Sequence, residues 1–449
     1  MRDSARYAWW LLVLLFSFAI FWNVFMFAQL FFGSPAHRSR SGMQVNLLTR
    51  RVLFLNDWGF GRSVVAQVVD TLAEGELSAP YEATLFKVLL REALGVGDPE
   101  RLLGTLPDLP SDSLTPLQRR WQAARWQALF QQPPKPEAIP NALESLHIPS
   151  PLLRDVAEVA LLRQAGDTAR ADALLQSLSR SASYAMLTVL VILACAGFGV
   201  VVGMILLVWY VFSRPPLPPR PEPSESPFVF DPLLWALVIF MLAISYLPVL
   251  RLWFLQWGID AFMPLYLAAV LLPLAYLHSI RREPNVLGRI HWFQGSWGEQ
   301  LQAGLMSYAM YLPLLLGLLA ITFWVIPALP AEQVNPVGEE GLENRTIGQW
   351  LWTFVRAAVL APIVEEFVFR GVLFKVLWQR TGRVWLSAFV SGYLFAVIHP
   401  QFLGGIFPLT VFGTVAALAY AHTRSLLPCI VLHALNNGVL VIMLWASAG

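Results

Sequence analysis

Charged residues and cysteines are both scarce in this sequence. Only 13% of its 449 residues are charged, whereas soluble domains contain about 25%. The two cysteines, Cys195 and Cys429, lie in apolar runs without the spacing of a metal site, so they indicate no disulfide framework. The net charge of +2 is too small to indicate a nucleic-acid partner.

Long apolar runs are abundant instead. Hydrophobic residues make up 57% of the chain, and a helix that crosses a bilayer needs about 20 mainly apolar residues. We count nine candidate runs, give or take one, at residues 9–32, 184–212, 229–249, 259–279, 303–327, 347–374, 384–399, 403–421 and 427–447. The first run is longer than the apolar segment of a cleaved signal peptide, so we interpret it as an uncleaved anchor.

Residues 34–183 differ in composition from these runs. Charges of both signs are frequent there, and Pro and Gly interrupt segments of helical period. Residues 152–178 place apolar side chains at helical spacing around a Gly-Asp turn, which predicts a helix pair. The sequence does not identify a partner for this region.

The predicted fold class is therefore all-α, a polytopic transmembrane helix bundle of about 8–9 spans with an N-terminal soluble helical domain. The expected order is an N-terminal transmembrane anchor (1–33), a soluble helical domain (34–183), a transmembrane helix (184–213), a Pro-rich linker (214–227) and a membrane-embedded domain (228–449).

The distribution of Lys and Arg over the short loops predicts the orientation in the membrane. With a cytoplasmic N-terminus, the segments on that side carry Arg2, Arg6, Arg214, Arg220, Arg281, Arg282, Arg289, Lys375, Arg380, Arg383 and Arg424. The opposite short loops carry only Arg251 and Arg345. We therefore expect a multi-pass protein of the cell membrane, with residues 34–183 outside the cytoplasm and the linker inside.

Polar side chains recur in three apolar runs near the C-terminus. An ionisable group inside a span costs about 2.5–3.5 kcal/mol on insertion, so it indicates function. The three clusters are VEEFVFRG with Glu365, Glu366 and Arg370, FAVIHP with Phe395 and His399, and HALNN with His433 and Asn437.

The two carboxylates of the first cluster have different surroundings. Glu366 and Arg370 are four residues apart and share a helix face, so they can neutralise one another. Glu365 points about 100° away on a helix of 3.6 residues per turn. One carboxylate is therefore expected to be structural and the other free for chemistry.

Depth in the membrane links Glu365 to the second cluster. Glu365 lies 17 residues before Gly382, and His399 lies 17 residues after it. In two antiparallel helices joined at Gly382, carboxylate and imidazole fall at the same level and can take a proton from a water between them. His433 and Asn437 share a helix face and can donate hydrogen bonds to an oxyanion. This pattern predicts peptide hydrolysis inside a membrane.

The motifs EExxxR, FxxxH and HxxxN, in this order over residues 345–447, resemble the CPBP family of membrane proteases. That family includes CAAX prenyl endopeptidases and bacteriocin-immunity relatives. The resemblance implies that Glu365 and His399 activate water, that His433 and Asn437 form the oxyanion site, and that Glu366, Arg370 and Phe395 support them. It also implies a membrane protein or lipidated peptide as substrate, and a glutamate mechanism without a cofactor.

Three alternatives remain open at this point. Glu365, His399 and His433 could instead supply three zinc ligands, although the sequence has no HExxH motif. The chain could be a non-catalytic membrane scaffold or immunity protein that works by binding a partner. A transporter would relay protons through the same residues, but it predicts internal repeats, and the sequence shows none.

Overall fold

The computed structural model describes residues 40–77, 80–96, 103–111, 114–148, 150–213, 291–325, 346–399 and 403–448, with shorter stretches within 7–17 and 215–276. Every regular element among these residues is a helix. The chain divides into two compact units. One consists mainly of Pro35–Ala194, which we call the helical unit, and the other contains Cys195–Val337 and Leu351–Val441, which we call the second unit.

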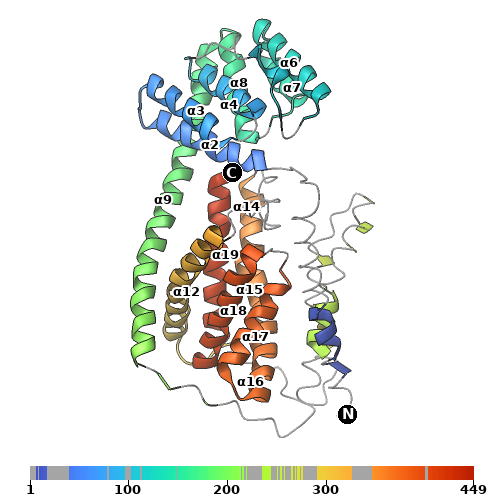
Figure 1. Ribbon diagram of the computed structural model, residues 1–449, viewed down its shortest axis with the longest axis vertical. Coiled ribbons are helices and arrows are strands. Elements are labelled where there is room, and N and C mark those ends of the chain that lie inside the picture. Colours follow the sequence, from blue (N-terminus) through green and yellow to red (C-terminus); the bar gives the residue numbers. More distant parts are fainter. Residues whose placement is uncertain are drawn as a thin grey trace. The chain divides into compact units, whose positions relative to one another are not determined.

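The helical unit is built from short helices that follow one another closely (Figure 1). They are α2 (Arg40–Asp57), α3 (Arg62–Glu76), α4 (Pro80–Ala93), η1 (Leu106–Asp108), α6 (Pro116–Gln131), η2 (Pro136–Ala138), α7 (Ile139–Glu144), α8 (Pro151–Gln164) and the first part of α9 (Thr168–Ser213).

Local sequence signals set these boundaries. Thr115 and Gln118 form a capping box at the start of α6, which satisfies two backbone N–H groups that a helix start leaves free. Ser150 caps the start of α8 with a single bond, by accepting a hydrogen bond from the Leu153 N–H. Gly166 has a φ of +81°, a left-handed conformation that ends a helix and that glycine adopts without strain. The predicted helix pair around the Gly-Asp turn is thereby confirmed as α8 and α9.

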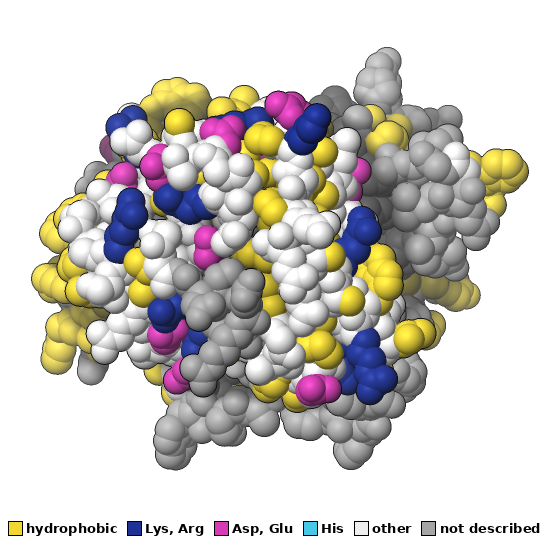
Figure 2. All heavy atoms as spheres, turned by 90° about the horizontal axis from the view of Figure 1, so that it is seen from above, with side chains coloured by type: hydrophobic (Ala, Val, Ile, Leu, Met, Phe, Trp, Pro, Cys, Tyr) yellow, Lys and Arg dark blue, Asp and Glu magenta, His cyan; other side chains and the backbone are white. Residues whose placement is uncertain are grey.

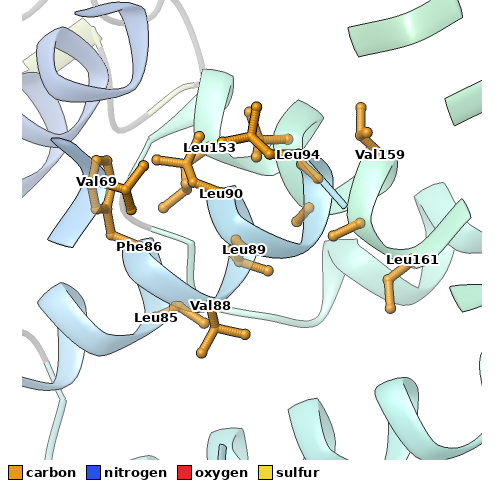
Figure 3. Packing of buried hydrophobic residues seen from close by; sticks show 14 of the residues in the cluster. Val69, Leu85, Phe86, Val88, Leu89, Leu90, Leu94, Leu153, Val159 and Leu161 are labelled. Atoms are coloured by element: carbon orange, nitrogen blue, oxygen red, sulfur yellow. The ribbon is translucent and has the colours of Figure 1, made fainter. Parts of the chain in front are cut away.

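The helical unit has an apolar core of its own. Side chains from α3, α4 and α8 meet there, and Figure 3 shows ten of them, Val69, Leu85, Phe86, Val88, Leu89, Leu90, Leu94, Leu153, Val159 and Leu161. On the face in Figure 2, Lys and Arg side chains are interspersed with Asp and Glu. The helical unit therefore packs around an apolar core of its own and has charges of both signs on its surface.

A few polar groups are nevertheless buried in this unit. Arg50 is only 2% exposed, and burial lowers its pKa to about 10 because a charged form loses hydration. Burial likewise raises the pKa of Glu92, opposed by a hydrogen bond from Gln164. That bond, 2.9 Å from Nε2 to Oε1, joins α8 to α4.

The second unit contains the long apolar helices. They are α12 (Trp297–Val325), α14 (Ile347–Phe354), η3 (Val355–Leu360), α15 (Ala361–Glu366), η4 (Phe367–Phe374), α16 (Lys375–Thr381), α17 (Val384–Val397), α18 (Leu403–Thr423) and α19 (Leu427–Ala448), with the later part of α9. Within it, α12 and α15–α19 run side by side (Figure 1), and α17 packs closely on α18.

Four helices among the described residues are long and apolar enough to cross a membrane. They are Thr168–Ser213, Trp297–Ile321, Gly405–Thr423 and Leu427–Ala446, and they match four of the nine predicted runs. The run 384–399 forms a shorter apolar helix, α17. The runs 9–32, 229–249 and 259–279 lie largely outside the described residues.

The run 347–374 is helical but is not one regular α-helix. Two π-helical segments, η3 and η4, interrupt it on either side of the six-residue α15. Part of the cause lies in Pro362, which has no N–H and so cannot donate to the carbonyl of Ala358. Such widened turns are rare in helices and occur often at functional sites.

Glycines allow α17 and α18 to approach closely. A Cβ on Gly392 would lie 2.5 Å from the Thr410 carbonyl oxygen, and one on Gly413 would lie 2.6 Å from the Gly392 Cα. Any larger residue at either position would separate the two helices. Small residues at such contacts are typical of helix packing in membranes.

Core packing predicts how the helical unit responds to substitution. Leu89 is fully buried, so Leu89→Ala should reduce the free energy of unfolding by about 2–5 kcal/mol. Leu117 is 80% exposed on α6, and Leu117→Ala should change it by no more than about 0.5 kcal/mol. Urea denaturation of residues 35–183, followed by far-UV circular dichroism, would measure both. Equal effects would contradict the placement of this core.

Candidate active site

Three helices supply the polar side chains that the sequence singled out. Glu365 and Glu366 are the last two residues of α15, His399 follows the end of α17, and His433 lies in α19. Gly382, with a φ of +68°, ends α16 and lets the chain reverse into α17. The reversal brings residues far apart in the sequence to one place.

Glu365 faces two imidazoles at once. Its Oε2 lies 3.7 Å from His399 Nε2 and 3.7 Å from His433 Nε2. These separations are too long for direct hydrogen bonds, but one water can bridge groups at such a distance. The proximity of Glu365 and His399 that the sequence predicts is therefore observed. The carboxylate is 16% exposed and the His399 side chain 23%, so a small molecule can reach both.

The orientation of His399 is set by the residue one turn before it. His399 Nδ1 lies 2.7 Å from the Phe395 carbonyl oxygen. A carbonyl only accepts, so Nδ1 carries the hydrogen and donates it. Nε2 is then the nitrogen that faces Glu365. The Phe395 ring packs on the imidazole, with centroids 4.5 Å apart.

Glu366 is buried and holds two partners. Its Oε1 accepts from Arg370 Nη1 at 2.9 Å and lies 2.7 Å from His433 Nδ1. Arg370 Nη2 also donates to the Gly413 carbonyl oxygen at 3.2 Å, and its guanidinium lies over the Phe395 ring. Neither Glu366 nor Arg370 is exposed. The pairing expected from the sequence is present, and it also fixes His433, which sequence reasoning did not foresee.

Asn437 binds a backbone carbonyl of the first π-helical segment. Its Nδ2 donates to the Ala357 carbonyl oxygen at 2.9 Å, and Ala357 lies in η3. Ser391 acts similarly on the other π-helical segment, since its Oγ donates to the Phe369 carbonyl oxygen at 3.2 Å. Both widened turns thus have a carbonyl held by a side chain from another helix, and no motif in the sequence singled out Ser391.

An apolar hollow lies beside α15. Its volume is about 110 Å³, and it is lined by Ala236, Leu237, Phe240, Pro273, Trp292, Ile363, Val364, Phe367, Val368 and Val372. Trp292 stacks on Phe367 with ring centroids 5.3 Å apart. The carboxylates and an apolar recess therefore share one short helix.

The described residues contain no group of three or more His, Cys, Asp or Glu side chains arranged to hold a metal ion. Glu365 Oε2 lies 3.7 Å from each of the two Nε2 atoms. With neutral imidazoles and an ionised carboxylate, all three atoms are acceptors. These three acceptor atoms therefore require a hydrogen-bond donor or a positively charged group between them.

Residues 347–439 match the family model described as Type II CAAX prenyl endopeptidase Rce1-like. The C-terminal region of this chain carries an Rce1-like domain. All the polar residues of the site lie within the matched stretch.

Three curated relatives align with this chain over stretches of 87 to 109 residues. The chain is 34% identical over 91 residues to the membrane-embedded CAAX protease MroQ of Staphylococcus aureus, which is 19% of this chain and 36% of that one. It is 29% identical over 87 residues to the putative membrane peptidase YdiL of Bacillus subtilis (19% and 35%). It is 30% identical over 109 residues to an uncharacterized 24.3 kDa protein of Escherichia coli (24% and 49%). The chain thus spans at most about half the length of these relatives. No solved structure matches it.

The two neighbouring carboxylates of the Rce1-like domain should differ in their effect on stability. Glu366→Gln removes the charge that balances buried Arg370, and breaking such a pair costs about 3–5 kcal/mol. Glu365→Gln keeps the size of a side chain that has no such partner, so the protein should remain folded. Thermal unfolding in detergent, followed by size-exclusion chromatography, compares the two. Equal stability of both variants would show that the Glu366–Arg370 pair is not structural.

Proposed function

We propose that the Rce1-like domain of this chain is an intramembrane endopeptidase, which hydrolyses a peptide bond of a membrane-associated substrate. The observation that carries this proposal is the position of Glu365 Oε2, 3.7 Å from the Nε2 atoms of both His399 and His433. A carboxylate and an imidazole at that separation can hold a water between them and accept its proton.

In the proposed reaction, Glu365 takes a proton from this water. At the same time the water oxygen forms a bond to the carbonyl carbon of the substrate. The electron pair of the C=O double bond moves onto the oxygen, which becomes an oxyanion. Collapse of the tetrahedral intermediate re-forms the C=O bond and breaks the C–N bond. The proton held by Glu365 or His399 passes to the leaving nitrogen, so the products are an acid and an amine.

His433 and Asn437 are the proposed oxyanion donors. His433 Nδ1 lies 2.7 Å from Glu366 Oε1, which directs Nε2 toward Glu365, and Nε2 can donate to the oxyanion when the imidazole carries both of its hydrogens. Asn437 Nδ2 uses one hydrogen for the Ala357 carbonyl, and a side-chain amide has a second hydrogen to donate. Both groups are held before substrate arrives, as stabilisation of a developing charge requires.

The proposed substrates are membrane proteins or lipidated peptides. An apolar hollow of about 110 Å³ on the same helix as Glu365 suits an apolar side chain or lipid group next to the bond that is cut. MroQ, one of the relatives, is named as a membrane-embedded CAAX protease. We extend that substrate class to this chain as part of the proposal.

A glutamate mechanism without metal is the version we propose. In the alternative, zinc would be bound by Glu365, His399 and His433, and Glu366 would orient His433 from behind, as carboxylates do for metal-bound histidines. The two versions differ in one measurement. Loss of activity in a chelator, restored by added zinc, would establish the metal-dependent version.

The test of the peptidase is the activity of Glu365→Gln. This change removes the proton acceptor, so cleavage should fall at least 100-fold, the lower end of what general-base catalysis contributes, about 10²–10⁴-fold. His399→Ala should lose activity similarly, and Glu299→Gln, an exposed carboxylate on α12, should not.

Substrates for this assay would come from comparing membrane proteomes with and without the protein. Each variant must first elute as a folded species in detergent. Wild-type turnover by Glu365→Gln would overturn the assignment. A cellular phenotype that persists while no cleavage depends on Glu365 would instead establish the scaffold alternative.

We also propose the orientation that the loop charges predict, with the N-terminus and residues 214–227 in the cytoplasm and residues 34–183 outside it. The four helices that are long and apolar enough to cross a membrane are consistent with a multi-pass protein. Protease added outside sealed spheroplasts should digest residues 34–183 and spare the linker. Digestion of that region only in inverted vesicles would show the opposite orientation.

A further inference from the structure

The turn between α2 and α3 exposes large apolar side chains. Trp58 is 59% exposed, Phe60 50%, and Val64, in the first turn of α3, 49%. Three large exposed apolar side chains close together in the sequence indicate a contact surface.

This exposure is built into the backbone. Gly59 has a φ of +77°, and the Phe60 N–H donates to the Leu55 carbonyl oxygen at 3.3 Å, which is the hydrogen bond of a Schellman helix end. The Trp58 ring also packs against Phe54, with centroids 5.2 Å apart. The aromatic side chains are therefore held outward by a defined turn.

The same turn lies against α9. Trp58 lines a hollow of about 260 Å³ whose other lining residues are Asp57, Arg180, Ser183, Tyr184 and Leu187. Figure 1 shows α2 next to α9 where α9 leaves the helical unit. Tyr184 is 71% exposed and Leu187 39%, so both helices contribute apolar surface at one level.

The sequence of α9 gives the position of that level relative to a bilayer. Arg180 is its last charged residue. Residues 184–212 rise roughly 43 Å at 1.5 Å per residue, which matches the about 40–45 Å of a bilayer with its headgroup regions. Tyr184 lies at one end of this stretch, and Trp209 and Tyr210 lie at the other. Tyr and Trp are enriched at both membrane–water interfaces.

We propose that the α2–α3 turn is a second membrane anchor of the helical unit. Trp58 and Phe60 enter the headgroup region of the bilayer that α9 crosses, beside Tyr184 and Leu187, and Arg180 lies at the level of the lipid phosphates. The partner is a lipid surface, because α9 itself carries this turn to the depth at which headgroups begin. A single helix leaves a domain free to tilt about it, and a second contact fixes the face that the helical unit turns to the membrane. This inference does not depend on the peptidase activity.

The test places a fluorescent probe on the turn of the full-length protein. Phe60→Cys and, as a matched control, Leu117→Cys are made in a Cys195→Ser background, and each is labelled with NBD. Cys429 is fully buried, and the background protein without a new cysteine measures any labelling there. Leu117 is 80% exposed on α6, which Figure 1 shows at the end of the helical unit remote from α9.

The labelled proteins are reconstituted into phosphatidylcholine vesicles with and without lipids that carry a doxyl quencher at carbon 5 of the acyl chain. The probe at position 60 should be quenched at least twofold more than the probe at position 117, and aqueous iodide should show the opposite order. Adding Trp58→Ala should reduce the doxyl quenching at position 60.

Equal doxyl quenching at both positions would overturn the proposal. Shielding of position 60 from iodide without doxyl quenching would also overturn it, because the turn would then contact protein and not lipid.

Discussion

The site depends on the contacts that the buried Glu366 carboxylate makes with Arg370 and His433. One oxygen binds Arg370 and His433 together, and Arg370 continues to the Gly413 carbonyl of α18. Two helices, α18 and α19, are thereby fixed relative to α15. An unpaired charge here would be very costly in a low-dielectric setting, so α15, α18 and α19 are stable only in the register that keeps these partners together. Glu365 immediately precedes Glu366 in the chain, so the same contacts also set its position.

The π-helical segments on either side of α15 help to hold its two adjacent carboxylates in place. In η3 and η4 the widened turns present carbonyls that other helices can bind, and Asn437 and Ser391 bind one each. Position 365 is therefore held from both sides by hydrogen bonds that do not touch its side chain. A reactive group needs this kind of support, since an acceptor that moves by 1 Å loses much of its catalytic effect.

Sequence reasoning could predict the parts of this site that follow from helical geometry. The 17-residue spacings about Gly382 placed Glu365 level with His399, and the four-residue spacing paired Glu366 with Arg370, because both depend only on a regular rise along helices. It could not predict the contact of Glu366 with His433, which depends on how α19 packs, nor the bond from Asn437 to Ala357, which depends on a widened turn. For the same reason the run 347–374 was expected as one regular helix: its hydropathy is continuous, and only Pro362 marks the interruption.

The charges of the cluster explain why it can exchange protons. Glu366 is balanced by Arg370, which leaves the negative charge of Glu365 facing His399 and His433. A neutral cluster in an apolar setting then needs one further positive charge, and a proton shared between Glu365 and His399 supplies it. The facing atoms of these two groups lie 3.7 Å apart, so moving the proton from one to the other requires little rearrangement. In the mechanism that we propose, Glu365 can therefore accept a proton from water and later release it to a leaving nitrogen without leaving an uncompensated charge in the membrane.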